Sequence, residues 1–380
     1  MNPGAPTDCY HGGAFFDAIG PEFNRLERRH CIIAADVLDA WFPPSPKVIA
    51  ALTEDLPWLL RTSPPTHSDG MTRVIARSRG VAPENILPGA GSSDLIFLAF
   101  RQWLNRDSRV LILDPTYGEY AHVLEKAIGC RVDRLTLSRD QDYRVDPDEL
   151  HEQAQERYDL IALVNPNSPT GQHVPRSELE ALLRRVQAAT LVWVDETYIE
   201  YAGPGQSLEQ FAATSKNVVV CKSMSKVYAL SGVRAAYLCG PANTLAGLRR
   251  ITPPWAVSLP AQVAAVAALQ DPAYYSARYR QTHALRAEFA RELNQFDGWE
   301  ILPGIANFVL CHLPQAKLNA ASLVAQCRRH NLFIRDANAM GSTFGGLAVR
   351  IAVKDAKSNA QILEVLKRVA SQNTPALQPH

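Results

Sequence analysis

The sequence lacks the features that mark secreted, membrane-spanning and nucleic-acid-binding proteins. Its formal net charge is only +1, which argues against nucleic acid or a membrane surface as a main partner. No apolar run approaches the length that crosses a bilayer. Residues 1–6 carry neither the basic nor the apolar part of a signal peptide. We therefore expect a cytoplasmic protein.

Cysteine is sparse and irregularly placed. The 7 cysteines form no C-x-x-C pair, and their number is odd. This spacing excludes the usual zinc motifs and a disulfide framework, and it is typical of reduced thiols in the cytoplasm. The sequence predicts no metal site.

The length exceeds that of one ordinary domain. A chain of 380 residues that is 47% hydrophobic and 20% charged has the composition of a globular protein of about two domains. We predict an N-terminal arm over residues 1–46, a large domain over 47–255 and a small domain over 256–380. The arm is irregular because proline and glycine are frequent in it. Its aromatic residues predict that it lies against the small domain or a partner chain.

Short apolar runs alternate with helical patterns between residues 108 and 222. Continuous apolar strands separated by helices predict an α/β fold with a mostly parallel sheet buried on both faces. The runs are Val110–Leu113, Leu160–Val164, Leu191–Val194 and Val218–Val220. Beyond residue 250, helical patterns precede β-rich pieces at 307–310, 332–335 and 348–353, which predict a smaller α+β domain.

Polar segments follow three of these strands. They are Asp114–Gly118, Asn165–Gly171 and Asp195–Tyr198. Because ligands of such sheets bind at the carboxyl ends of the strands, we expect these segments on one edge, together with the segment that follows the last strand.

That last segment, Ser223-Met224-Ser225-Lys226, is followed by Gly232 and Arg234. A lysine can form a Schiff base with an aldehyde only after it loses its proton, and a pocket can lower its pKa. Hydroxyls and a guanidinium suit a phosphate dianion. An aldehyde that also carries a phosphate is pyridoxal 5′-phosphate. The short pattern by itself is equally consistent with a surface lysine in a polar loop.

Three further features suit such a cofactor. The turn before Ser92 and Ser93 opens a helix, whose amide groups can bind an anion, although a plain capped helix has the same pattern. A carboxylate at Asp195 could keep the pyridine nitrogen protonated. Tyr198 could donate a hydrogen bond to the ring O3′, and Tyr117 could stack on the ring.

With these motifs in this order, the chain resembles the fold-type-I, class I/II pyridoxal-phosphate aminotransferases over essentially its whole length. Within them it is most similar to the branch that holds histidinol-phosphate aminotransferase and threonine-phosphate decarboxylase. The resemblance implies a three-layer α/β fold, pyridoxal 5′-phosphate as cofactor bound by the large domain, and a homodimer with active sites at the subunit interface.

The resemblance also implies roles for individual residues. Lys226 would form the Schiff base, Asp195 would pair with the pyridinium and Tyr198 would donate to O3′. The remaining cofactor-binding residues would be Ser92, Ser93, Tyr117, Ser168, Ser223, Ser225 and Arg234. Arg350 matches the arginine that binds the substrate α-carboxylate, and Arg335 matches the arginine that this branch uses for the substrate's phosphate.

The chain departs from the family pattern at three places. Ser168 stands where an asparagine normally contacts O3′. No tyrosine lies between Tyr10 and Tyr117, so the tyrosine that reaches the partner subunit's cofactor phosphate is missing. Thr66 or His67 either substitutes for it or is an ordinary loop residue. The family's N-E-N-P-type segment is replaced by residues 39–43.

The expected function is a pyridoxal-phosphate-dependent aminotransferase acting on an amino acid that bears a distal phosphate or similar anion. The alternative is a decarboxylase on the same scaffold, since the two reactions differ in which bond to Cα lies perpendicular to the ring. A third hypothesis is a non-catalytic ligand sensor that retains the fold. Retention of Lys226, Asp195 and Tyr198, without any added DNA-binding segment, argues against a sensor.

Overall fold

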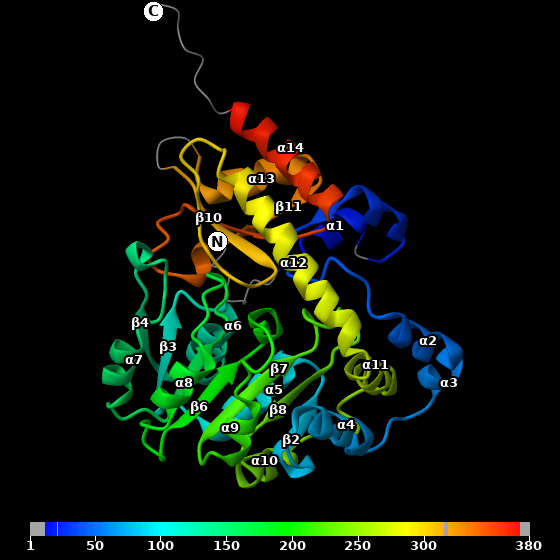
Figure 1. Ribbon diagram of the computed structural model, residues 1–380, viewed down its shortest axis with the longest axis vertical. Coiled ribbons are helices and arrows are strands. Elements are labelled where there is room, and N and C mark those ends of the chain that lie inside the picture. The colour runs from blue at the N-terminus through cyan, green and yellow to red at the C-terminus, as the bar shows by residue number, and fades with distance from the viewer. Residues whose placement is uncertain (1–11, 21, 315–317, 373–380) are drawn as a thin grey trace, which may run out of the picture.

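A seven-stranded sheet forms the centre of the larger layer of the molecule (Figure 1). The computed structural model describes residues 12–20, 22–314 and 318–372. The strand order is β2-β8-β7-β6-β5-β3-β4. The strands are β2 (Ile86–Gly89), β3 (Arg109–Asp114), β4 (Arg131–Thr136), β5 (Leu160–Val164), β6 (Leu191–Asp195), β7 (Val218–Ser223) and β8 (Ala236–Cys239).

The five strands β4, β3, β5, β6 and β7, in this spatial order, pair in parallel. Strand β8 runs antiparallel to both of its neighbours, β7 and β2. This confirms the predicted mostly parallel α/β sheet. Strands β2, β4 and β8 were not predicted from the sequence. Strand β4 lies at the edge of the sheet, and only Val132 and Leu135 are apolar in it, so it lacks the continuous apolar run by which the central strands were found.

Both faces of the large sheet are buried. Leu111 and Leu113 of β3 pack into one core, while Val110 and Ile112 pack into another. Helix α5 supplies apolar side chains to the second core, and α4, α7 and α8 supply the first. Burial on both faces explains why these strands read as unbroken apolar runs.

Helices over Leu259–Leu269 and Pro272–Leu293 precede the β-rich pieces of the C-terminal part, as predicted. Ser45 accepts a hydrogen bond from the Val48 amide at the start of α2. The helices are α1 (Phe15–Ile19), α2 (Pro46–Glu54), α3 (Leu56–Arg61), α4 (Asp69–Arg79), α5 (Ser92–Trp103), α6 (Gly118–Ala121), α7 (Pro147–Ala154), α8 (Arg176–Leu183), α9 (Glu209–Thr214), α10 (Ala242–Arg249), α11 (Leu259–Leu269), α12 (Pro272–Leu293), α13 (Ala320–Arg329) and α14 (Ala356–Gln372).

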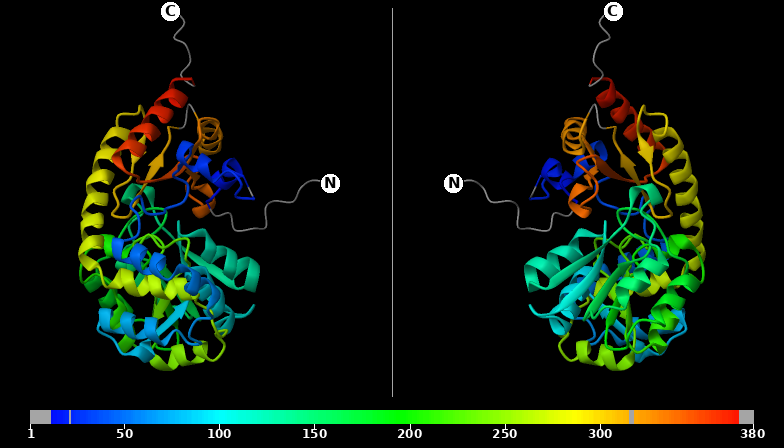
Figure 2. Two further views of the ribbon diagram at one scale, coloured as in Figure 1. Left: turned by 90° about the vertical axis from the view of Figure 1, so that its right-hand side faces the viewer. Right: turned by 90° about the vertical axis from the view of Figure 1, so that its left-hand side faces the viewer.

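A smaller four-stranded sheet, in the order β12-β13-β10-β9, lies above the large one in Figure 1. Its pairs are antiparallel, and helix α12 runs along one side of both layers (Figure 2). Two further strands, β1 and β11, pair in parallel beside it. The bounds are β1 (Ile33–Ala34), β9 (Glu300–Ile301), β10 (Phe308–His312), β11 (Leu332–Phe333), β12 (Arg335–Asp336) and β13 (Ala348–Ala352).

The described part of the arm is more regular than expected. It contains α1, a 3-10 helix over Leu26–Cys31 and strand β1, whose partner β11 belongs to the C-terminal part of the chain. Among the described glycines and prolines of the arm, Gly20 ends α1, and Pro43 and Pro44 follow β1, so they do not interrupt these short elements. Residues 1–11 and 21 lie outside the described residues, and the limits of the two domains remain predictions.

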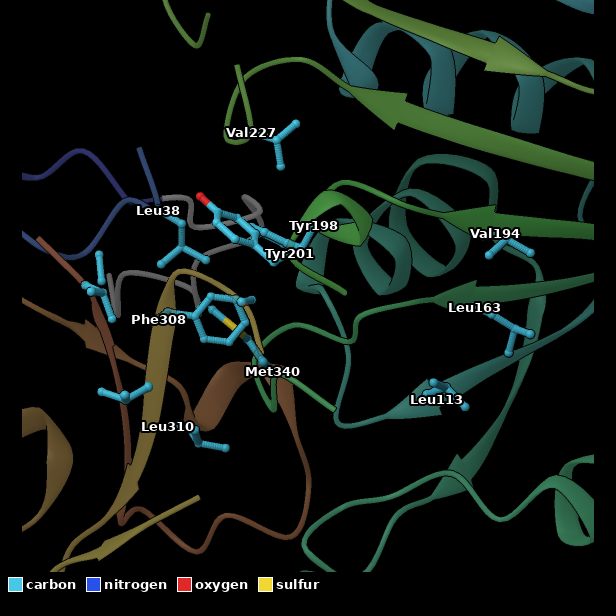
Figure 3. Close-up of a cluster of buried hydrophobic side chains, with 14 of the residues drawn as sticks. Leu38, Leu113, Leu163, Val194, Tyr198, Tyr201, Val227, Phe308, Leu310 and Met340 are labelled. Carbon is cyan, nitrogen blue, oxygen red and sulfur yellow. The ribbon is translucent and has the colours of Figure 1, made fainter. Parts of the chain in front are cut away.

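The two sheets meet through an apolar seam. Figure 3 shows Leu38 and Phe308 near Tyr198 and Tyr201, while Leu113 extends the same cluster along the large sheet. The Tyr198 and Phe308 rings meet edge to face at 5.4 Å between centroids. Within the part of the chain that the structure describes, no helix is both long and apolar enough to span a bilayer.

Candidate active site

A cavity of about 340 Å³ opens at the carboxyl ends of β5, β6 and β7. Its volume is within the range of small-molecule sites, roughly 300–1,000 Å³. Every residue predicted for the site except Arg335 is found in its wall. The predicted lining residues are Ser92, Ser93, Tyr117, Ser168, Asp195, Tyr198, Ser223, Ser225, Lys226, Arg234 and Arg350. Those that the sequence reading missed are Gly12, Asp36, Val37, Leu38, Val164 and Thr197.

One end of the cavity is built for an anion. Helix α5 begins there at Ser92, so its free amide groups face the cavity. Arg234 donates hydrogen bonds to Ser225 Oγ at 3.4 Å and to the Ser231 carbonyl at 3.0 Å. Gly91 has a φ of 101°, and a Cβ on it would lie 2.3 Å from Arg234 Nη2. Glycine at position 91 therefore leaves room for the guanidinium.

Asp195 is held rigidly at the end of β6. It is only 3% exposed and accepts hydrogen bonds from Tyr120 Oη at 2.8 Å and from Thr197 Oγ1 at 2.6 Å. Burial raises the pKa of Asp195, and the hydrogen bonds from Thr197 and Tyr120 oppose that rise. Trp193 donates in turn to Tyr120 Oη at 2.8 Å. This arrangement leaves a carboxylate aimed at the cavity with a fixed orientation.

Tyr117 and Ser93 share one acceptor. Glu119 Oε2 accepts from Tyr117 Oη at 2.6 Å and from Ser93 Oγ at 2.9 Å. Glu119 itself is 2% exposed. The shared carboxylate fixes the Tyr117 ring and the first turn of α5 relative to each other. In the sequence, the only sign of the contact between Glu119 and Tyr117 is that several polar residues follow β3 closely.

The amine of Lys226 contacts a carboxylate that the sequence reading did not assign. Lys226 Nζ lies 2.7 Å from Asp39 Oδ1 and 3.4 Å from Ser231 Oγ. Burial lowers the pKa of Lys226, and Asp39 opposes that fall. Burial would also raise the pKa of Asp39, but the ion pair with Lys226 holds it below its usual value. Asp39 lies in the segment that replaces the family's N-E-N-P motif.

Arg350 presents an unsatisfied donor at the seam between the sheets. Its Nη1 donates to Ser168 Oγ at 2.9 Å and its Nη2 to the Asp36 carbonyl at 3.3 Å. Its buried Nε has no hydrogen-bond partner within the described residues. Burial, together with the guanidinium of Arg335, lowers the pKa of Arg350 to about 10, against the opposing effect of Tyr198. A bound anion would accept a hydrogen bond from Nε and would stabilise the charged form of the guanidinium.

Arg335 lies beside Arg350 but not in the described wall of the cavity. The two residues are direct partners across β12 and β13. Arg335 is buried within this chain and is only 5% exposed. The Cβ atoms of such paired residues lie about 5 Å apart on the same face. Arg335 therefore adds positive potential next to Arg350.

Thr66 and His67 lie elsewhere. They line a second cavity of about 270 Å³ together with Arg249 and residues of α4. Neither is among the described residues that line the first cavity. Within one chain they do not replace the missing tyrosine, and a role across a subunit interface remains a prediction.

The residues of the first cavity fit pyridoxal 5′-phosphate. Serine hydroxyls, helix amides and Arg234 would hold its phosphate, and Asp195 would hold its ring nitrogen. Tyr117 and Tyr198 offer aromatic contacts, and the Lys226 amine is within the same wall. The buried Nε of Arg350 remains for a substrate anion.

Comparison with known proteins agrees with this chemistry. The family model described as "Aminotransferase class I and II" matches residues 38–369. A histidinol-phosphate aminotransferase of Rhodopseudomonas palustris (strain BisB18) is 29% identical over 335 residues, which cover 87% of this chain and 89% of the relative.

Two solved structures share the fold. The histidinol-phosphate aminotransferase from Sinorhizobium meliloti in complex with pyridoxal-5′-phosphate has a TM-score of 0.78 at 24% identity, covering 96% of this chain and 100% of that one. The L-threonine-O-3-phosphate decarboxylase from Porphyromonas gingivalis has a TM-score of 0.75 at 24% identity, covering 90% of this chain and 100% of that one.

The anion end of the cavity yields a prediction. Gly91→Ala should weaken binding of pyridoxal 5′-phosphate by at least about tenfold, because the new Cβ displaces Arg234 and a charge-assisted hydrogen bond contributes roughly 1.5–3 kcal/mol. Absorbance titration of the cofactor-free protein measures the dissociation constant. Gly118→Ala is the matched control, since a Cβ there meets nothing within 4 Å. Equal affinities of Gly91→Ala and wild type would contradict the assignment.

Proposed function

Because the chain belongs to the class I and II aminotransferases, a family of pyridoxal-phosphate-dependent enzymes, we propose that it transfers the amino group of a small amine that carries a phosphate. One observation carries the proposal: Lys226, Asp195 and Arg350 share the wall of a single cavity. Histidinol phosphate is the first substrate to test, since it stands in the name of the curated relative.

Lys226 and Asp195 would perform the proton chemistry. When bound, the cofactor supplies a ring that accepts the electrons of a bond broken at the substrate Cα. Lys226 would hold the cofactor covalently and, once released, would take the proton from Cα. Its lowered pKa favours the neutral amine that this step needs. Asp195 would keep a proton on the ring nitrogen, in an orientation maintained by Tyr120 and Thr197.

The remaining site residues would bind and orient. Tyr198 would donate to O3′, and Ser168 would fix Arg350, to which it is hydrogen-bonded. The phosphate and ring of the cofactor would be held by Ser92, Ser93, Tyr117, Ser223, Ser225 and Arg234.

The arginine pair favours a phosphate at the substrate end of the cavity. Arg335 and Arg350 lie side by side across two strands, so their charges act on the same region. A phosphate dianion matches two adjacent guanidinium groups better than a single carboxylate does. The two arginines could bind an α-carboxylate and a phosphate at the same time only if these two groups lay close together in the substrate.

The same cavity would serve a decarboxylase if the substrate's carboxylate bond stood perpendicular to the ring. Transamination is the proposal because the curated relative is named an aminotransferase. Release of CO₂ in the substrate assay below would assign the chain to the alternative.

Several exposed apolar side chains support a homodimer. Trp58 is 47% exposed, Leu60 71% and Trp255 55%. The Trp255 amide donates to the Thr66 carbonyl, which places its loop against the segment that follows α3. Helices α2 and α3 lie at the outside of the molecule (Figure 1). Leaving these side chains in water is unfavourable, and an obligate interface buries more than about 2,000 Å².

The lysine assignment is testable by chemical trapping. Borohydride reduction of the yellow holoprotein should fix pyridoxal phosphate to Lys226, and Lys226→Ala should carry no adduct. Peptide mass spectrometry locates the modification. Lys216→Ala, at an exposed lysine before β7, should keep the adduct. An adduct on any other lysine of the wild-type protein would refute the assignment.

Substrate charge gives a second test. Amines bearing a phosphate should exceed neutral analogues at least about tenfold in kcat/KM, because a charge-assisted contact contributes roughly 1.5–3 kcal/mol. Arg335→Ala should remove most of this preference, and Arg350→Ala should weaken every substrate. Keto product and CO₂ are assayed in parallel.

Arg329→Ala, at an exposed residue of α13, serves as the control in this series. Equal rates on neutral and phosphorylated amines, unchanged in Arg335→Ala, would exclude the proposed specificity.

The homodimer is tested by light scattering at micromolar concentration. Wild type and Arg157→Asp, a change in an exposed loop, should both have twice the mass of the 41.9 kDa chain. Leu60→Asp should shift the mass toward that of one chain, because a charge would be buried in the interface. A monomeric wild-type protein with full activity would refute the dimer.

A further inference from the structure

The carboxylate of Asp39 stands against the amine of Lys226. The Nζ–Oδ1 distance of 2.7 Å is that of a charge-assisted hydrogen bond. The Asp39 side chain is 44% exposed and the Lys226 side chain 19%. The carboxylate is thus the more exposed member of the pair, and the amine is the more buried one.

The backbone around Asp39 is anchored to the small sheet and its flanks. The Leu38 carbonyl accepts from Asn307 Nδ2 at 2.9 Å, and the Asp39 carbonyl accepts from Lys354 Nζ at 3.4 Å. Lys226, in contrast, follows β7 of the large sheet. The contact between Asp39 and Lys226 therefore joins the two layers through fixed positions.

Ser231 completes the contact. Its Oγ lies 2.6 Å from Asp39 Oδ1 and 3.4 Å from Lys226 Nζ. It also lies 3.1 Å from the Ser225 carbonyl, which ties it to the loop that carries the lysine. Lys226, Ser231 and Asp39 form a closed set in which each member contacts the other two.

Other charged groups face this set from neighbouring elements. The guanidinium groups of Arg350, on β13, and Arg234, after β7, lower the pKa of Lys226 in addition to burial. Lys354, which follows β13, faces both Asp39 and Lys226.

Acidic and phenolic groups also lie nearby. Asp36 faces Lys354, and the phenol of Tyr198 faces Asp39. Within this group Asp39 is the carboxylate that contacts the Lys226 amine directly.

We propose that Asp39 is a positioning residue that, with Ser231, holds the amine of Lys226 whenever that amine is not bonded to the cofactor. The neutral amine takes a proton from the substrate Cα and becomes an ammonium ion. Asp39 pairs with this ion until the proton is given up again, so no other reactant is needed. The inference rests on the proposed role of Lys226.

The test measures the lysine in cofactor-free protein. Competitive labelling with isotopic acetic anhydride, followed by mass spectrometry, gives the pH dependence of Lys226 reactivity. Asp39→Asn should raise the labelling rate at pH 7.5 at least about fivefold, because loss of a partly screened anion at this distance lowers the lysine pKa by about 1. Asp39→Glu should restore most of the wild-type profile.

Ser231→Ala should produce a smaller increase of the same sign, and Asp107→Asn, at an exposed acid, should change nothing. An unchanged Lys226 labelling profile in Asp39→Asn would overturn the proposal. So would an equal increase in Asp39→Glu, because only the lost carboxylate should matter. If borohydride places the adduct on another lysine, the proposed function fails separately, since labelling of Lys226 does not depend on the cofactor.

Discussion

The burial of Arg350 between the two sheets is the constraint on which the site depends. A guanidinium removed from water is unfavourable unless hydrogen bonds or an anion compensate. Ser168 and the Asp36 carbonyl supply two hydrogen bonds, the Phe308 ring lies 5.6 Å from the guanidinium carbon, and Nε is left without a partner among the described residues. The neighbouring Arg335 opposes the charge. An anionic ligand would therefore complete the seam electrostatically.

A second set of buried charges, in which two cations are paired with three glutamates, lies beneath the site. Lys222, 2% exposed, lies 2.8 Å from Glu200 and 3.6 Å from Glu196, and Arg79 lies 3.4 Å from Glu209. Burial raises the pKa of Glu196 to about 7, with Lys222 opposing the rise. This buried cluster ties α4 to β7. It thereby holds the strand from which Lys226 extends, and its surplus of carboxyl groups is eased if Glu196 is protonated near neutral pH.

The cavity is consequently assembled from both layers. The large sheet contributes Asp195, Lys226 and the anion end, and the small sheet contributes Arg350. Asp39, in the segment after β1, contacts Lys226 from outside the described wall. Arg350 contacts Ser168, and Asp39 contacts Lys226, so side chains from the two layers touch at both places. A rearrangement between the layers would alter substrate binding and lysine chemistry together.

The sequence by itself determined the fold and most of the cavity wall. Unbroken apolar runs identify strands buried on both faces, and the edge where parallel strands end places Asp195, Ser168 and Lys226 together. Local patterns, however, record only periodicity and chain order. They could not place Asp39 on a lysine 187 positions away, nor Tyr120 on Asp195. Nor could they show that Arg335 pairs with Arg350 beside the cavity, because that depends on strand register. Those contacts were decided by packing in three dimensions.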